Sequence, residues 1–178
     1  MRTQKQWENY NYPKVLLEFT PRLREDVQTY SSKVKVPEYG SYYISGPTNT
    51  GKSTLAGSMY IEARKKQYFD RLPGSYLFLS AYSFFVELKK SFEDHTEDEH
   101  AVLAKYSNAQ YLVIDDLGST KFTEWGTSVL QMLINNRYEN LLTTVITSNL
   151  SLDDLGTALG DQRTTSRIRR MCKLLKTK

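Results

Sequence analysis

The 178-residue sequence predicts a three-layer α/β fold, with helices on both faces of a mostly parallel sheet of five strands. Two observations support this prediction. From Tyr39 onward, short runs rich in β-forming residues alternate with longer runs of helical periodicity, which is the order that crossover helices between parallel strands produce. In addition, Tyr111–Ile114 is an unbroken apolar run of strand length, as expected for a strand that is buried on both faces.

The elements can be predicted in order along the chain. Residues 1–38 precede the sheet and are expected to hold a short helix around Arg22–Lys33, because Thr20-Pro21 suits a helix start. The five expected strands are Ser41–Ser45, Ser75–Ser80, Tyr111–Ile114, Thr143–Thr147 and Cys172–Leu175. The expected core helices are one that ends near Asp70, then Tyr82–Phe92, Thr123–Glu139, one capped by Ser151 with Asp154 three residues on, and Asp161–Met171.

The composition argues against membrane and secreted proteins. The mean hydropathy is −0.54, and no apolar run approaches the roughly 18 residues that cross a bilayer. Met1–Tyr10 lacks the apolar region of a secretory signal. The single cysteine, Cys172, can form neither an internal disulfide nor a zinc cluster. We therefore expect a cytoplasmic protein with no membrane partner.

Positive charge is concentrated at the C-terminal end of the chain. The formal net charge is only +4, yet residues 163–178 carry seven basic residues and no acid. These bases are Arg163, Arg167, Arg169, Arg170, Lys173, Lys176 and Lys178. Such a cluster can neutralise the phosphates of a nucleotide or a nucleic acid, or it can form a solvated basic tail.

A phosphate-binding loop follows the first expected strand. Residues 46–53 satisfy the pattern G-x-x-x-x-G-K-[ST], with a β-rich run before it and a helical run after it. Gly51 permits the tight turn that aims successive N–H groups at a polyphosphate. Lys52 is expected to neutralise β- and γ-phosphate oxygens, and the Ser53 hydroxyl to bind Mg²⁺. The expected nucleotide-binding residues are Gly46, Pro47, Thr48, Asn49, Thr50, Gly51, Lys52, Ser53 and Thr54.

Two adjacent acids follow the third expected strand. In open α/β sheets ligands bind at the C-terminal ends of the strands, which is where Asp115 and Asp116 lie. Asp115 is expected to hold Mg²⁺, directly or through water. Asp116 is expected to orient and deprotonate an attacking water, or else only to open the turn before Gly118. Because aspartate is one methylene shorter than glutamate, hydrolysis by Asp116 is expected to be slow.

The strand between Lys52 and Asp115 places the acid pair on the third strand, an order typical of ATPases with an extra strand beside the phosphate loop. In such a sheet the fourth strand lies between the first and the third. Asn149 would then emerge beside the γ-phosphate, where its amide can contact both the phosphate and the water. The alternative is that Asn149 is only a turn or capping residue before Ser151.

Five motifs together resemble the DnaC-like helicase-loader ATPases of the AAA+ superfamily and their IstB-type transposition relatives. The matching stretches are GPTNTGKSTLA (46–56), LVIDDLG (112–118), TEWGTSVLQMLINNRYEN (123–140), TTVITSNLSLDDL (143–155) and GDQRTTSRIRRMC (160–172). The resemblance implies a P-loop NTPase core over residues 39–178, ATP and Mg²⁺ as ligands, and assembly into a ring or spiral. It also implies a replicative helicase as partner and action on single-stranded DNA without sequence specificity.

The resemblance also assigns roles to individual positions. Lys52 and Ser53 match the Walker-A residues, Asp115 and Asp116 the Walker-B pair, and Asn149 the sensor-1 position. Arg167 matches the arginine finger that reaches the ATP of a neighbouring subunit, and Arg163, four residues earlier, is the second candidate. Both arginines can alternatively be surface residues or DNA phosphate contacts.

The chain departs from these loaders at both ends. Only 38 residues precede the core, and they are expected to act as an extension that binds a partner, with Trp7, Tyr10 and Tyr12 as candidate anchors. A lid domain is expected to be absent or minimal, because the sequence ends just past the last expected strand. The predicted function is a slow ATPase that loads a helicase. The alternatives are a nucleotide-gated transposition adaptor with weak hydrolysis and a small-molecule kinase.

Overall fold

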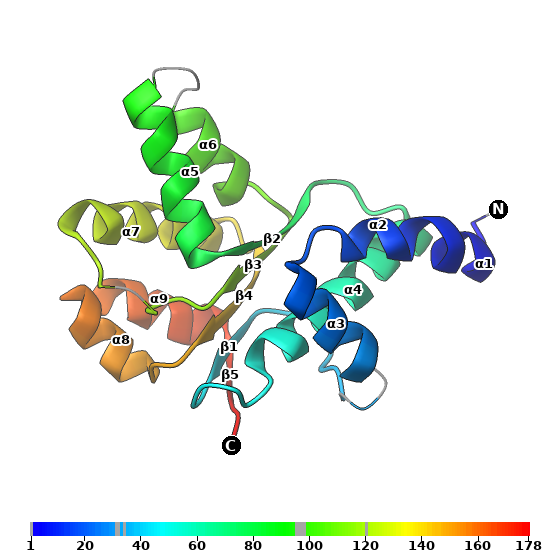
Figure 1. The fold of residues 1–178 in the computed structure, drawn as a ribbon. Coiled ribbons are helices and arrows are strands. Elements are labelled where there is room, and N and C mark those ends of the chain that lie inside the picture. Colours follow the sequence, from blue (N-terminus) through cyan, green and yellow to red (C-terminus); the bar gives the residue numbers. More distant parts are fainter. Residues whose placement is uncertain (1, 31–32, 34, 95–98, 120) are drawn as a thin grey trace.

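The computed structural model describes residues 2–30, 33, 35–94, 99–119 and 121–178, and it confirms the predicted α/β fold (Figure 1). One sheet of five strands has the order β2-β3-β4-β1-β5. All four neighbouring pairs are parallel. The fourth strand therefore lies between the first and the third, as the motif order predicts.

The strands agree closely with the predicted segments. Their bounds are β1 (Tyr42–Ser45), β2 (Tyr76–Ser80), β3 (Tyr111–Asp115), β4 (Thr143–Ser148) and β5 (Lys173–Lys176). Three of them end one residue later than predicted, on Asp115, Ser148 and Lys176. The prediction stopped where the apolar or β-branched run stopped, whereas backbone pairing continues into the polar residues at the C-terminal edge of the sheet.

Side chains of each central strand alternate between two separate cores, as the two-residue period of a strand requires. Tyr43, Leu112 and Ile114 point to one core, which α5 (Ala81–Asp94), α6 (Glu99–Ser107), α7 (Glu124–Glu139), α8 (Leu152–Leu159) and α9 (Gln162–Met171) cover. Ile44 and Val113 point to the other core, which is covered by α4 (Lys52–Asp70) and the N-terminal helices. Figure 1 shows the sheet between these two layers of helices.

Among the helices that cover the sheet after β1, the predictions omit one. The helix α6 was not predicted, because its buried side chains Val102 and Tyr106 are too few to give a clear helical period. The other core helices lie where expected, and Ser151 accepts a hydrogen bond from the Asp154 N–H at the start of α8. The Asp154 carboxylate accepts from the Ser151 hydroxyl rather than from the Ser151 backbone, so only half of the capping box forms.

The N-terminal residues pack onto α4 and continue its core. They form α1 (Gln4–Gln6), a π-helical turn η1 (Trp7–Asn11), α2 (Tyr12–Leu16) and α3 (Pro21–Tyr30). The helix α3 begins one residue before the predicted Arg22–Lys33, and residues 31–32 of that prediction lie outside the described part of the chain. At Gly57 of α4 a Cβ atom would lie 2.9 Å from Val27 Cγ2, so α3 and α4 approach closely.

Burial corrects one expectation about the N-terminal aromatic residues. Trp7 is only 4% exposed and packs against Tyr68, so it contributes to the core and is not a free anchor for a partner. Tyr10 is 66% exposed, and Tyr12 is half-buried. The division of the chain at residue 38 and a partner-binding role for the extension remain predictions.

Candidate nucleotide-binding site

The predicted site residues converge on one large pocket at the C-terminal edge of the sheet. The pocket has a volume of about 990 Å³, which is at the upper end of the range for small-molecule sites. The predicted site residues that line it are Thr48, Asn49, Thr50, Gly51, Lys52, Ser53, Thr54, Asp115, Asp116 and Asn149. Gly46 and Pro47 do not line the pocket within the described residues, but their carbonyls contact Lys52.

The loop between β1 and α4 has the backbone shape that the motif requires. Asn49 and Gly51 both have positive φ angles, of 63° and 81°. Gly51 is the N-cap of α4 and supplies no side chain to satisfy the first N–H groups of that helix. By contrast, Thr123, Ser151 and Asp161 cap α7, α8 and α9 with side-chain oxygens. The open N-terminus of α4 therefore presents N–H donors and its positive dipole end to the pocket.

Lys52 is buried, and its ammonium group lies on the loop itself. Its Nζ donates to the Gly46 carbonyl at 2.9 Å and to the Pro47 carbonyl at 2.6 Å. Burial lowers the pKa of Lys52, and the nearby carboxylates of Asp116 and Asp115 partly oppose that shift. The ammonium is thus held inside the loop by carbonyls that an incoming anion can replace.

Asp115 and Asp116 are linked through a residue that the sequence analysis did not identify. Thr147, on the neighbouring strand β4, donates from its Oγ1 to Asp115 Oδ1 at 2.6 Å and accepts from the Asp116 N–H at 2.8 Å. Asp116 has a φ of 60°, a left-handed conformation that costs energy in a non-glycine residue. The Thr147 hydroxyl therefore fixes both acids. Its signal in the sequence was only its place at the end of a β-branched run.

Burial raises the pKa of Asp115 above its usual value, while hydrogen bonds from Thr147 and Ser53 partly lower it. The Ser53 hydroxyl and the Asp115 carboxylate are therefore adjacent. Two adjacent hard oxygen donors fit Mg²⁺, which takes one or two protein ligands and completes its shell with phosphates and waters. Among the described residues no group of three or more His, Cys, Asp or Glu side chains could hold a metal by itself.

The strand β5 supports the loop from behind, which the sequence analysis also did not predict. Just after β5, the Thr177 N–H donates to the Ser45 carbonyl at 2.8 Å. The hydroxyls of Thr177 and Thr50 are hydrogen-bonded at 2.5 Å. A Cβ atom at Gly46 would collide with Thr177. Glycine at position 46 thus allows the end of the chain to lie directly against the phosphate loop.

One wall of the pocket comes from the N-terminal helices. Its residues are Glu18, Thr20, Arg22, Leu23, Asp26 and Tyr30. The Glu18 carboxylate accepts hydrogen bonds from the Tyr60 hydroxyl and from Arg64 on α4, the latter at 2.6 Å. This link joins the segment between α2 and α3 to the helix that begins at the phosphate loop. Nothing in the loop motif indicated this wall.

The two candidate arginine fingers lie elsewhere. Arg163 is exposed and Arg167 is half-buried, and both belong to α9. Among the described residues that line the pocket, neither arginine appears. Arg169 of the same helix forms an ion pair with Asp153 at 2.7 Å, so part of the basic cluster is engaged within the chain.

The parallel sheet and the phosphate loop between β1 and α4 together define a protein of the P-loop class. The chain belongs to the family of IstB-like ATP-binding proteins, whose pattern matches residues 2–177. No curated protein matches the chain in sequence. Of the described helices, none is both long and apolar enough to cross a membrane.

Solved structures share the fold. The DnaC helicase loader superposes with a TM-score of 0.64 at 24% identity, over 99% of this chain and 100% of that one. The DnaI structure superposes with a TM-score of 0.67 at 18% identity, over 93% and 94% of the two chains. The replication initiator DnaA bound to AMPPCP and single-stranded DNA gives a TM-score of 0.64 at 19% identity. That match covers 92% of this chain and 49% of DnaA.

Proposed function

We propose that this protein is an oligomeric ATPase of DNA replication that hydrolyses ATP slowly and helps to load a replicative helicase onto single-stranded DNA. The observation that carries the proposal is the convergence of loop amides, Lys52, the Asp115–Asp116 pair and Asn149 on one pocket. The family's ATP-binding description and the likeness to DnaC support it.

ATP binding uses groups that the ligand-free protein already holds in place. The loop amides and the N-terminus of α4 receive the phosphates. The Lys52 ammonium exchanges the Gly46 and Pro47 carbonyls for β- and γ-phosphate oxygens. Ser53 and Asp115 would hold Mg²⁺, which would supply positive charge to neutralise those phosphates.

Hydrolysis requires a positioned water. The Asp116 carboxylate orients this water and accepts its proton, and the Asn149 amide binds the γ-phosphate. Arg163 and Arg167 lie outside the pocket of their own chain. One of them, with Arg167 as the first candidate, acts instead on the ATP of a neighbouring subunit. Turnover therefore depends on assembly.

The test is ATP turnover by the assembled protein with and without single-stranded DNA. We expect DNA to raise the rate, and Asp116→Asn to lower the rate while nucleotide binding is retained. Loss of nucleotide binding in Asp116→Asn would show that this carboxylate has a structural role. An ATP turnover rate that single-stranded DNA does not change would contradict action on the strand.

One observation favours a second candidate function, a nucleotide-gated adaptor that barely hydrolyses ATP. Asp116 has a short side chain on a left-handed backbone that Thr147 holds, which limits its reach toward a water. Comparing ATP turnover with nucleotide-dependent filament or ring formation separates the two functions. Assembly with ATP in the absence of measurable phosphate release would favour the adaptor.

A further inference from the structure

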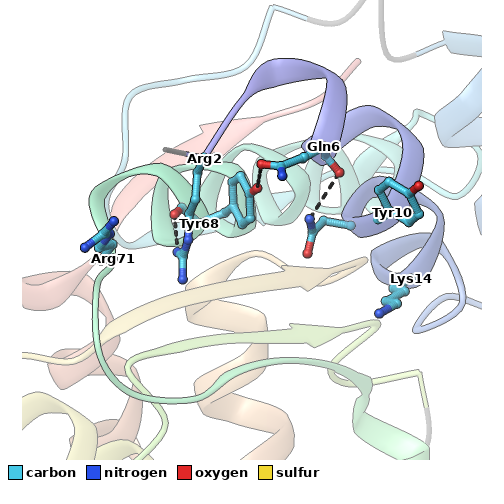
Figure 2. Close-up of a pocket in the computed structure, with 7 residues that line it drawn as sticks. Arg2, Gln6, Tyr10, Lys14, Tyr68 and Arg71 are labelled. Carbon is cyan, nitrogen blue, oxygen red and sulfur yellow. Dashed lines mark hydrogen bonds between the residues drawn. The ribbon is translucent and has the colours of Figure 1, made fainter.

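A second pocket lies at the opposite end of α4 from the phosphate loop. It has a volume of about 560 Å³ and is lined by Arg2, Gln6, Tyr10, Asn11, Lys14, Tyr68 and Arg71 (Figure 2). The 19 residues of α4 span about 28 Å at 1.5 Å per residue, and the described residues that line the two pockets do not overlap. The second pocket is therefore separate from the nucleotide site.

The lining of this pocket is basic, aromatic and polar. Three of its seven residues are cations, none is acidic and none is aliphatic. Two acids are close in sequence to the lining residues, and both have partners: Asp70 is paired with Lys66 at 2.6 Å, and Glu8 accepts from the Gln4 side chain at 2.7 Å. Within the described part of the chain, the side chains of Lys14 and Arg71 make no ion pair or hydrogen bond. Two cations are therefore available to an anionic ligand.

The remaining side chains hold the pocket in shape. Arg2 donates to the Tyr68 carbonyl near the end of α4, and its guanidinium lies 4.7 Å from the centre of the Tyr68 ring. The Tyr68 hydroxyl donates to Gln6 Oε1 at 3.3 Å, and the Asn11 side chain donates to the Gln6 carbonyl at 3.3 Å. These contacts join Arg2 and α1 to α4, and they hold η1 against α1. Arg2 has a structural contact, so Lys14 and Arg71 carry the argument for a ligand.

The arrangement suits an extended ligand rather than a single anion. Figure 2 shows Arg2 and Arg71 at one end of the pocket and Tyr10 and Lys14 at the other. The Tyr10 ring is 66% exposed, which leaves its face open for stacking. Cations that track a backbone beside an exposed aromatic ring are the usual means of binding single-stranded nucleic acid. Protein segments are usually anchored by apolar side chains at the core of an interface, and none of the seven lining residues is aliphatic.

We propose that this pocket binds single-stranded DNA, with Arg71 and Lys14 on successive stretches of the phosphate backbone and a base stacked on Tyr10. The inference rests on the part of the proposed function that concerns DNA. It places DNA binding at a site that is separate from the basic residues of the C-terminal cluster. The strand would then lie at the far end of α4 from the ATP.

The test is fluorescence anisotropy of the full chain with a labelled oligothymidylate of about 16 nucleotides, over a range of salt concentrations. The double variant Lys14→Glu/Arg71→Glu is expected to bind roughly tenfold more weakly and to lower the salt slope by about 1.4, for two lost phosphate contacts. Lys35→Glu/Lys90→Glu is the matched control, because both positions are exposed, lie outside the pocket and change the net charge equally. The control is expected to bind like wild type.

Tyr10 gives a test that net charge does not influence. Tyr10→Ala is expected to weaken binding roughly fivefold or more, and Tyr10→Phe to keep wild-type affinity, because stacking needs only the ring. Unchanged melting temperatures confirm that each variant is folded. Because Tyr10 is largely exposed, both changes are expected to leave the fold intact.

The outcomes separate this inference from the proposed function. If wild type binds DNA and Lys14→Glu/Arg71→Glu binds equally well, or if the control variant is weakened as much, the pocket is the wrong site and DNA handling stands. If wild type binds no oligothymidylate, both ideas fail. Polyglutamate can be added at the same concentration of negative charge as the oligothymidylate. If it displaces the oligothymidylate, the pocket is a site for an acidic protein and the nucleic-acid assignment is overturned.

Discussion

Asp115 is the residue at which ligand binding and stability oppose each other. Its carboxylate is buried beside Ser53 and Thr147, and burial raises its pKa. An acid whose pKa rises on folding destabilises the folded chain once it is ionised, so its cost appears as the pH rises through the folded pKa. We infer that the protein keeps a destabilising charge at the position where Mg²⁺ would bind.

Asp115→Asn should therefore raise the melting temperature of the protein at neutral pH, and in a chain of this size each 1 kcal/mol of added stability corresponds to about 2–4 °C. It should also abolish Mg²⁺-dependent ATP binding. Calorimetry at several pH values provides the check. The difference in melting temperature between Asp115→Asn and wild type should shrink as the pH falls and Asp115 takes up a proton. A difference that persists at acidic pH would reject the electrostatic explanation.

Thr147 acts through the two acids. Thr147→Val leaves the Asp116 N–H and an oxygen of Asp115 without this partner, which should cost about 1–3 kcal/mol. ATP turnover should fall more than ATP affinity, because the water-orienting carboxylate loses its fixed backbone. Thr147→Ser keeps the hydroxyl and is the control. Equal effects of Val and Ser on turnover would argue against a positioning role.

Among the elements, the contact between α3 and α4 joins the N-terminal residues to the nucleotide pocket. Gly57 allows this contact because a Cβ atom there would lie only 2.9 Å from Val27 Cγ2. The same helix α3 supplies part of the pocket wall. The N-terminal residues therefore contribute to the pocket through packing.

Glycine inside a helix usually gains about 1 kcal/mol when it is replaced by alanine. At position 57 we expect no gain, since overpacking against Val27 costs about 1–3 kcal/mol. In a Val27→Ala background the new methyl group has room, so Gly57→Ala should become stabilising there. Melting temperatures of the two single variants and the double variant measure this coupling. If the effects of Gly57→Ala and Val27→Ala simply add in the double variant, the contact between α3 and α4 at Gly57 is looser than the structure indicates.

The sequence predicted the five strands and most of the helices that cover them, and most of the predicted site residues line one pocket, for a physical reason. A phosphate loop is a local pattern, and the predicted strands follow from apolar runs that pack on both faces. The wall from α3 and the hydroxyl of Thr147 are tertiary contacts between distant segments, and no local pattern encodes them. Arg137 shows the same limit. It is fully buried and donates to the Tyr106, Ala109 and Thr143 carbonyls, yet in the sequence it is an ordinary charged residue near a helix end.

At the scale of the whole molecule, the nucleotide pocket and the helix α9 that carries the candidate fingers are separate parts of one chain. A pocket completed by a neighbouring subunit explains this separation. The proposed assembly therefore predicts that defects in two different subunits can complement each other.

Neither Arg167→Ala nor Lys52→Ala should hydrolyse ATP alone, because the first lacks the finger and the second lacks the binding cation. Mixed together, Lys52→Ala subunits can supply Arg167 to ATP held by Arg167→Ala subunits, and part of the turnover should return. Phosphate release from a titrated mixture measures this. Full activity of assembled Arg167→Ala alone would remove Arg167 from the site and leave Arg163 as the candidate.

A calorimetric titration with Mg·ATP tests the nucleotide site most directly. Wild type should take up ATP to saturation, and Lys52→Ala should bind roughly 10–100-fold more weakly, because a charged hydrogen-bonding partner of the phosphates is lost. Lys35→Ala, an exposed lysine outside the pocket, should match wild type. No saturable uptake by wild type, or equal uptake by Lys52→Ala, would contradict the assignment of this pocket to ATP.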